Sequence, residues 1–300
     1  MIFLNYCMIA GSRIRKLINQ SVNKRTSNYR NDNIRIVQQY MQEQNKRNEV
    51  DESIRYASRL QRALLPSETD LRNINAASFL FSISRNELSG DFSWYTRSGS
   101  KIILAVADCT GHGIPGALMS VLGLSLLNQV VLEERCYIPS HILRRIDEKM
   151  RITFQHAEEN PRDTFDGMDI GLCVIDTATK TLSFSGAMRP CWLIIDGKLL
   201  EIQGSRYPIG GMRLEAKREY TSTEINYSAG DQLYLFTDGY SDQFGGKDDK
   251  KMTRGRLRQL IEMIKGLPVE QQKAQLQEFF LLWKGGREQT DDVTMLGMKL

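Results

Sequence analysis

The sequence predicts an α+β fold, in which antiparallel strands and separate blocks of helix form the layers of one domain. The first observation is a series of short aliphatic and aromatic runs from about residue 74 onward, joined by tight turns. The second is that the helical segments form two blocks, at about residues 115–158 and 254–284, and do not alternate with the strands. With 300 residues, 41% of them hydrophobic, the chain can bury one large core or two small ones.

The first eleven residues, MIFLNYCMIAG, are apolar and are followed by Arg13, Arg15 and Lys16. This run is shorter than the roughly 20 residues that span a bilayer, and it lacks the preceding basic stretch of a signal peptide. Two interpretations stay open: a frayed terminus, or the cytoplasmic end of a membrane helix, where basic residues gather. We expect residues 1–33 to be a basic segment, membrane-proximal in the second case, on a protein that is cytoplasmic or membrane-associated.

Residues 34–65 contain neither proline nor glycine and predict one long polar helix, which Pro66 ends. Residues at alternating spacings of four and three form a weak coiled-coil seam, apolar at both ends and charged in the middle. The seam consists of Ile36, Tyr40, Glu43, Arg47, Val50, Ile54, Ala57, Gln61 and Leu64. A single solvated helix is the alternative. We expect residues 34–66 to form a parallel dimerising helix that passes a signal to the next domain.

Seven apolar runs in the remainder of the chain predict β-strands. They are ASFLFSI, KIILAVAD, IGLCVID, TLSFSGA, CWLIID, DQLYLFTD and VTMLGMKL. Asp176–Lys180 and Asp196-Gly197 have the composition of hairpin turns, so neighbouring strands should pair antiparallel. Pro115 suits the first turn of the helical block that it begins.

Four aspartates stand where an apolar run stops or starts: Asp91, Asp108, Asp238 and Asp291. Each carboxylate should therefore lie at a sheet edge. Carboxylates gathered in this way repel one another unless protons or cations neutralise them. No histidine or cysteine stands nearby at a suitable spacing, and oxygen ligands alone favour Mg²⁺ or Mn²⁺ over zinc. The sequence therefore predicts a metal site and an enzyme.

Cysteine spacing and charge exclude several other classes of protein. The five cysteines are widely spaced without a CxxC, which fits a reducing cytoplasm and neither a zinc ribbon nor a secreted disulfide scaffold. The net charge of +4 arises in residues 1–50, which hold nine Lys or Arg against three Asp or Glu. The rest of the chain has no basic field for nucleic acid.

Three other motifs do not define a site. Gly111–Gly116 fits GxGxxG, but Asp108 at the strand end would repel a pyrophosphate unless a cation lay between them. Cys7 and Arg13 have the spacing of a cysteine phosphatase, but no strand precedes them. A Ser-His-Asp triad lacks its GxSxG elbow.

Five segments, in their order along the chain, resemble a known family. They are GDFSW, ADCTGHGIPGALMS, DGMDIGLCVID, GDQLYLFTDGYSDQFGG and QTDDVT. The sequence is similar to the bacterial PPM-type serine/threonine phosphatases, in the branch of stage II sporulation protein E and the sigma-factor regulatory phosphatases. The resemblance covers about residues 54–300, with a lead-in at Ile54–Pro66. It implies a layered α-β-β-α sandwich of two mainly antiparallel sheets flanked by helices, with an N-terminal coiled-coil-like extension and a phosphatase domain over residues 67–300.

By this resemblance Asp91, Asp108, Asp238 and Asp291 are catalytic, and together with the backbone carbonyl of Cys109 they would hold two Mn²⁺ or Mg²⁺ ions. Many relatives have glycine in place of this cysteine, and a carbonyl ligand tolerates the change. The cations would lower the pKa of a bridging water, so that hydroxide attacks phosphorus in line.

Further residues near these motifs have roles that the sequence leaves open. His112 would protonate the leaving oxygen or hold the Gly-rich turn. Arg189 would bind substrate phosphate or, as the more expected alternative, lie at the surface or pair with a helix. Asp166 and Asp169 would shape a turn or lie on a loop beside the site, and Asp292 is a neighbour of the ligands.

The resemblance implies a protein serine/threonine phosphatase that acts on a phosphorylated regulatory protein similar to anti-anti-sigma factors. We expect control by the N-terminal helix, a homodimer through that helix and no nucleic-acid partner. A membrane-linked sensor is a further partner if residues 1–33 are membrane-proximal. The alternative is a catalytically inactive pseudophosphatase that binds phosphoproteins. Retained, mutually repelling carboxylates argue against this alternative.

Overall fold

The computed structural model describes residues 2–157, 166–211 and 218–300 and divides the chain into two units, Met1–Arg55 and Tyr56–Leu300. The described residues of the first unit, 2–55, all belong to helix α1 (Ile2–Leu64). The predicted helix is therefore present, and it extends N-terminally beyond residue 34. Ile36, Tyr40 and Val50 of the predicted seam are exposed in the single chain.

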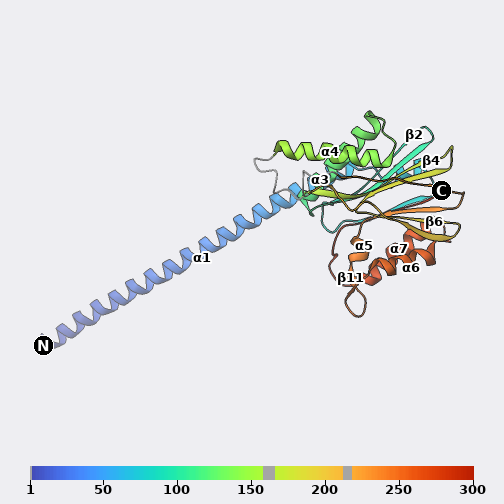
Figure 1. The fold of residues 1–300 in the computed structure, drawn as a ribbon. Helices are drawn as coiled ribbons and strands as arrows, with labels where there is room; N and C mark the ends of the chain where they lie inside the picture. Colours follow the sequence, from blue (N-terminus) through green and yellow to red (C-terminus); the bar gives the residue numbers. More distant parts are fainter. Residues whose placement is uncertain (1, 158–165, 212–217) are drawn as a thin grey trace. The chain divides into compact units, whose positions relative to one another are not determined.

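The second unit contains two large sheets, in which every strand pair is antiparallel (Figure 1). The first sheet has the order β1 (Ser78–Ile83), β13 (Val293–Lys299), β10 (Gln232–Phe236), β6 (Cys191–Ile195) and β7 (Lys198–Ile202). The second has the order β2 (Asp91–Ser98), β3 (Lys101–Cys109), β4 (Gly167–Asp176), β5 (Thr181–Ala187) and β9 (Thr223–Asn226), with β8 (Ile209–Gly210) paired to β4. A short hairpin joins β11 (Phe244–Gly245) and β12 (Lys250–Lys251).

Helices cover the outer face of each sheet. The second sheet is covered by α3 (Ile114–Leu127), its π-helical continuation η1 (Asn128–Glu133) and α4 (Pro139–Ala157). The first sheet is covered by α6 (Arg254–Ile264) and α7 (Val269–Lys284), while α2 (Glu68–Ile74) and α5 (Gly239–Asp242) are short. The predicted helical block at residues 115–158 is thus two helices, separated after Glu133.

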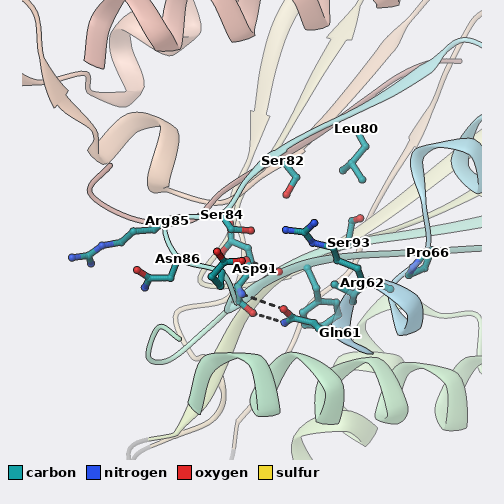
Figure 2. A pocket seen from close by; sticks show the side chains of 14 residues that line it. Gln61, Arg62, Pro66, Leu80, Ser82, Ser84, Arg85, Asn86, Asp91 and Ser93 are labelled. Atoms are coloured by element: carbon teal, nitrogen blue, oxygen red, sulfur yellow. Dashed lines mark hydrogen bonds between the residues drawn. The ribbon is translucent and has the colours of Figure 1, made fainter. Parts of the chain in front are cut away.

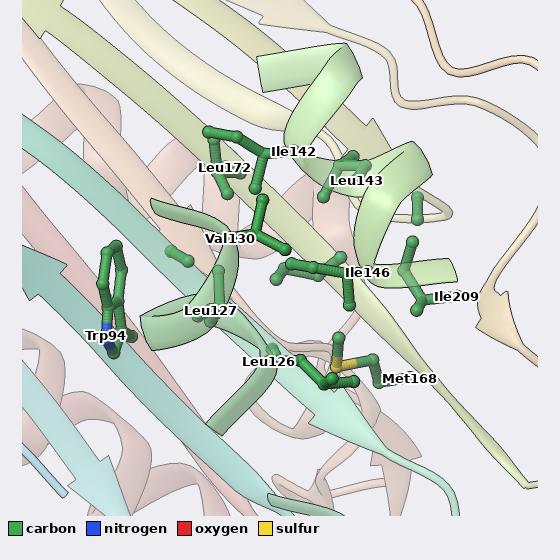
Figure 3. Packing of buried hydrophobic residues seen from close by; sticks show 14 of the residues in the cluster. Trp94, Leu126, Leu127, Val130, Ile142, Leu143, Ile146, Met168, Leu172 and Ile209 are labelled. Carbon is green, nitrogen blue, oxygen red and sulfur yellow. The ribbon is translucent and has the colours of Figure 1, made fainter. Parts of the chain in front are cut away.

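Three clusters of buried apolar side chains hold these layers together. Between α3, η1, α4 and the second sheet, Leu127, Val130 and Ile142 pack with Trp94 and Leu172 (Figure 3). A second cluster lies between the first sheet and its helices, and a third lies between the sheets. The predicted α+β fold, a helix-sheet-sheet-helix sandwich, is confirmed.

One helical stretch in the described part of the chain, Ile114–Glu133, is long and apolar enough to cross a membrane. It is the α3–η1 helix, and 56% of its apolar window is buried inside the domain. Leu127 and Val130 of this stretch lie in the core against the second sheet, so its apolar composition is explained by packing (Figure 3).

Candidate active site

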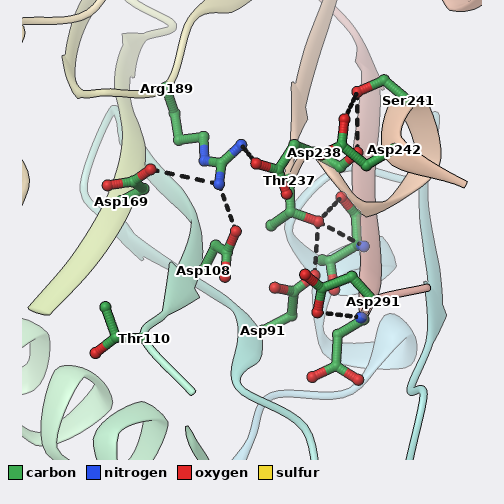
Figure 4. A network of polar contacts seen from close by, with 12 residues as sticks. Asp91, Asp108, Thr110, Asp169, Arg189, Thr237, Asp238, Ser241, Asp242 and Asp291 are labelled. Atoms are coloured by element: carbon green, nitrogen blue, oxygen red, sulfur yellow. Dashed lines mark hydrogen bonds and ion pairs between the residues drawn. The ribbon is translucent and has the colours of Figure 1, made fainter. Parts of the chain in front are cut away.

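Strand register gathers aspartates at one end of the second sheet. Asp91 of β2 lies directly opposite Asp108 of β3, and Asp108 lies opposite Asp169 of β4. In the first sheet, Asp238 follows β10 and Asp291 precedes β13, two strands that pair with each other. Both sheets therefore present carboxylates to one polar network (Figure 4).

Asp91 is the most enclosed of these carboxylates, with 4% of its surface exposed. Its Oδ2 accepts a hydrogen bond of 2.6 Å from Thr237 Oγ1, which links the second sheet to the end of β10. Burial raises the pKa of Asp91 well above its usual value, and repulsion by Asp108 and Asp292 adds to this effect. An ionised Asp91 therefore needs a cation nearby.

The ionised form of Asp108 is also disfavoured by its surroundings. Burial raises its pKa to about 7; Arg189 opposes the rise, and Asp238 and Asp291 contribute to it by repulsion. Burial likewise raises the pKa of Asp169 and of Asp291. The fold thus holds carboxylates together at a place where ionisation is costly.

Arg189 is the cation at the centre of this network. Its Nη2 pairs with Asp108 and lies 3.4 Å from Asp169 Oδ2, while its Nη1 lies 2.9 Å from Asp238 Oδ2 (Figure 4). The side chain is buried, with 5% of the residue exposed. The expected surface or helix-pairing role of Arg189 is therefore wrong, because the β5–β6 connection directs this side chain inward.

Asp292 holds the loop that precedes β2. Its carboxylate accepts hydrogen bonds of 2.7 Å from the backbone N–H groups of Arg85 and Gly90, and its own N–H donates to Asp291 Oδ1 at 2.8 Å. Asp292 therefore positions the chain immediately before Asp91.

The Gly-rich turn after β3 packs closely against the same loop. A Cβ atom at Gly116 would lie 2.2 Å from the carbonyl oxygen of Gly111, and one at Gly90 would lie 2.8 Å from it. Cys109 is buried at the end of β3, and its N–H donates to Gly90 O at 3.4 Å. The turn thus fixes the main chain around the Cys109 carbonyl.

The structure shows where the remaining candidates from the sequence lie. His112 is exposed, and its Nδ1 lies 3.5 Å from Asn86 Nδ2. Asp166 precedes β4 and accepts a hydrogen bond of 3.4 Å from Thr110 Oγ1. Asp169 lies within β4 beside Asp108, so the turn expected at this residue is wrong. Sequence reasoning missed Thr237, although its place next to Asp238 was a usable signal.

The donor set of this network suits a hard divalent cation, because it consists of buried carboxylates that repel one another. Among the residues that the structure describes, no group of three His, Cys, Asp or Glu side chains stands close enough together to hold a metal ion. The carboxylates are instead paired with Arg189.

The two antiparallel sheets and their flanking helices have the fold of a PP2C-type phosphatase domain. The family model of Stage II sporulation protein E (SpoIIE) matches residues 98–300, which is more than half of the chain. The protein belongs to the SpoIIE family.

Solved structures of phosphatase domains share this fold. The SiaA-PP2C domain of Pseudomonas aeruginosa is similar with a TM-score of 0.76 and 27% identity, over 85% of this chain and 98% of that one. The phosphatase domain with a regulatory fragment of SpoIIE from Bacillus subtilis has a TM-score of 0.58 and 20% identity, over 75% and 63%. RsbX in complex with magnesium has a TM-score of 0.52 and 14% identity, over 74% and 94%. A comparison with curated proteins finds no match.

Proposed function

We propose that this protein is a metal-dependent protein serine/threonine phosphatase. Asp91, Asp108, Asp238 and Asp291, with the carbonyl of Cys109, would hold two Mn²⁺ or Mg²⁺ ions. The observation that carries the proposal is that carboxylates from the ends of both sheets lie in one polar network. Burial and mutual repulsion raise the pKa values of three of them, Asp91, Asp108 and Asp291. The magnesium named for the similar RsbX structure supports this choice of metal.

The bound cations would supply an activated water and screen the phosphate charge. The protein's own contribution is positioning. Thr237 orients Asp91 through its hydroxyl group, and Asp292 holds the loop before β2 through two backbone N–H groups. These contacts link Asp91 and the loop before it to the segments that carry Asp238 and Asp291.

A phosphatase assay tests the function. With p-nitrophenyl phosphate or a phosphoserine peptide and Mn²⁺, we expect turnover that EDTA abolishes and that Asp238→Asn lowers by more than about a hundredfold. The control is Asp242→Asn, since Asp242 lies close by in α5 but pairs with Lys251 at 2.8 Å. No metal-dependent turnover of the wild type above that of Asp238→Asn would favour the pseudophosphatase, which binds a phosphoprotein without hydrolysing it.

The substrate that we propose is a phosphorylated regulatory protein of the anti-anti-sigma type. Membership in the SpoIIE family supports a serine-phosphorylated protein in a signalling circuit. The similarity to the RsbU and RsbW domains of Rv1364c, at 17% identity, adds a likeness of fold alone.

Control by α1 is a further part of this proposal, and Gln61 is the residue that supports it. Gln61 Nε2 donates to Ser89 O at 2.6 Å and to Ser120 Oγ at 2.8 Å, and Gln61 Oε1 accepts from Ser89 N at 3.2 Å. Gln61 and Asp91 line the same pocket (Figure 2). Ser89 lies two residues before Asp91, and Ser120 lies in α3, which follows the Gly-rich turn. One amide therefore connects the end of α1 to the loop before Asp91 and to α3, the helix that follows the Gly-rich turn after Asp108.

We expect Gln61→Met to raise the Mn²⁺ concentration for half-maximal activity by about tenfold, since outer contacts of a metal site contribute about 10–100-fold to affinity. Methionine keeps the length of the side chain but removes all three hydrogen bonds. Arg59→Met, on an exposed part of the same helix, is the control. If the two variants titrate with Mn²⁺ alike, Gln61 does not couple α1 to the site.

Two expectations for the N-terminal region stay predictions. The exposed seam residues support a homodimer through residues 34–66, which sedimentation of the full chain measures. A membrane-linked sensor through residues 1–33 rests on the apolar and basic sequence there.

A further inference from the structure

The main chain of Arg189 is fixed at the site. A Cβ atom at Gly186 would lie 2.1 Å from the Arg189 carbonyl oxygen, and one at Gly204 would lie 2.4 Å from it, so both glycines are in close contact with this peptide. The preceding Met188 has a φ of 62°, which is uncommon for a residue with a side chain. The guanidinium can therefore change position through its side-chain torsions while its backbone stays in place.

The guanidinium lies where the carboxylates of the two sheets meet. It pairs with Asp108 of the second sheet and with Asp238 after the first sheet, and Asp169 is its third acidic neighbour. Two of these three carboxylates, Asp108 and Asp238, are proposed metal ligands. The Arg189 guanidinium and a divalent ion would therefore compete for the oxygen atoms of Asp108 and Asp238.

The contacts of Arg189 are incomplete. Its Nε atom is buried and has no hydrogen-bond partner among the residues that the structure describes. A buried N–H group without a partner costs free energy. The guanidinium also faces three carboxylates with a single positive charge, whereas a divalent ion would bring two.

We propose that Arg189 is the resident counter-ion of this carboxylate cluster, and that a divalent cation binds by displacing its guanidinium from Asp108 and Asp238. The inference rests on the proposed metal site and adds a residue that sets the affinity of that site. Without metal, Arg189 limits the repulsion among the buried carboxylates. With metal, the same charge would oppose binding, so the arginine lowers the apparent affinity for the ion.

The test is Mn²⁺ binding to the full chain without substrate, measured from the electron paramagnetic resonance signal of free Mn²⁺. We expect Arg189→Met to bind Mn²⁺ about tenfold more tightly than the wild type or better, because a competing charge at contact distance is gone. Arg189→Lys should fall between the two, since lysine keeps the charge but cannot pair with two carboxylates through separate nitrogens. Equal or weaker binding by both variants would overturn the proposal.

The matched control is Arg218→Met. Arg218 is also a buried arginine and pairs with Asp147 at 3.0 Å, outside the cluster, so its loss should leave Mn²⁺ affinity unchanged. Thermal melting without metal checks folding, and if Arg189→Met does not fold, the affinity of Arg189→Lys decides: tighter than wild type supports the proposal, equal or weaker overturns it. Mn²⁺ binding is measured without any phosphatase reaction. An absence of phosphoserine hydrolysis would therefore refute the proposed function but would not refute this inference.

Discussion

Replacing Asp91 by Asn should lower metal-dependent phosphatase activity by more than about a hundredfold and should stabilise the metal-free protein at neutral pH. Activity falls because an anionic ligand is lost from the proposed metal site. Stability rises because Asp91 is 4% exposed and stands beside Asp108 and Asp292, which repel its charge. The asparagine carbonyl can still accept the hydrogen bond from Thr237, so the link between the sheets is kept.

The pH dependence separates this explanation from a general structural effect. The pKa of Asp91 is raised in the folded state, so its stabilising contribution is present in acid and is lost as the pH rises above the usual carboxyl range. In EDTA, Asp91→Asn should therefore melt increasingly above the wild type between about pH 5 and about pH 8. A variant that melts below the wild type at both values contradicts the account. Asp248→Asn, at an exposed position, is the control for a change of surface charge.

Gly239→Ala is expected to destabilise the protein by about 3 kcal/mol or more and to remove activity. A Cβ atom at Gly239 would lie 1.9 Å from the carbonyl oxygen of Asp292 and 2.8 Å from its carbonyl carbon. Both are backbone atoms, so they cannot move aside as a flexible side chain would. The clash would separate Asp238 from the segment that carries Asp291.

Urea denaturation of the Gly239→Ala variant, compared with that of a Gly255→Ala control, measures this loss of stability. Gly255 lies in α6, where the nearest atom to an added Cβ is Thr253 Oγ1 at 3.9 Å, so alanine should be tolerated or slightly stabilising. Equal stability of the two variants would show that the close approach of Gly239 to Asp292 does not hold the site together.

The seven apolar runs read from the sequence all occur as strands, because each has enough apolar residues to be buried in a sheet. The two-residue strands β8, β11 and β12 lie outside these runs, since such short pairings depend on tertiary contacts rather than on a local pattern. The strands β2, β7 and β9 also lie outside them, because polar residues interrupt their apolar pattern. The pairing of β1 with β13 was equally inaccessible, as these strands stand at opposite ends of the domain sequence.

In the candidate site too, some residues could be predicted from the sequence and others depend on the tertiary fold. Asp91, Asp108, Asp238 and Asp291 could be named because each stands at the end of an apolar run. Arg189 could not be placed from its sequence, because only the β5–β6 connection and the packing of both sheets bring its side chain to the aspartates. The contact between Thr237 and Asp91 also joins residues that are 146 positions apart.

The most direct test of the central claim is a Mn²⁺ titration of the wild-type full chain, in which bound metal and phosphate release from a phosphoserine peptide are measured in the same samples. We predict that phosphate release rises together with metal occupancy, reaches its maximum when two ions are bound, and disappears when EDTA removes them. Saturation with Mn²⁺ without phosphate release, or phosphate release that persists in EDTA, would contradict a metal-dependent phosphatase.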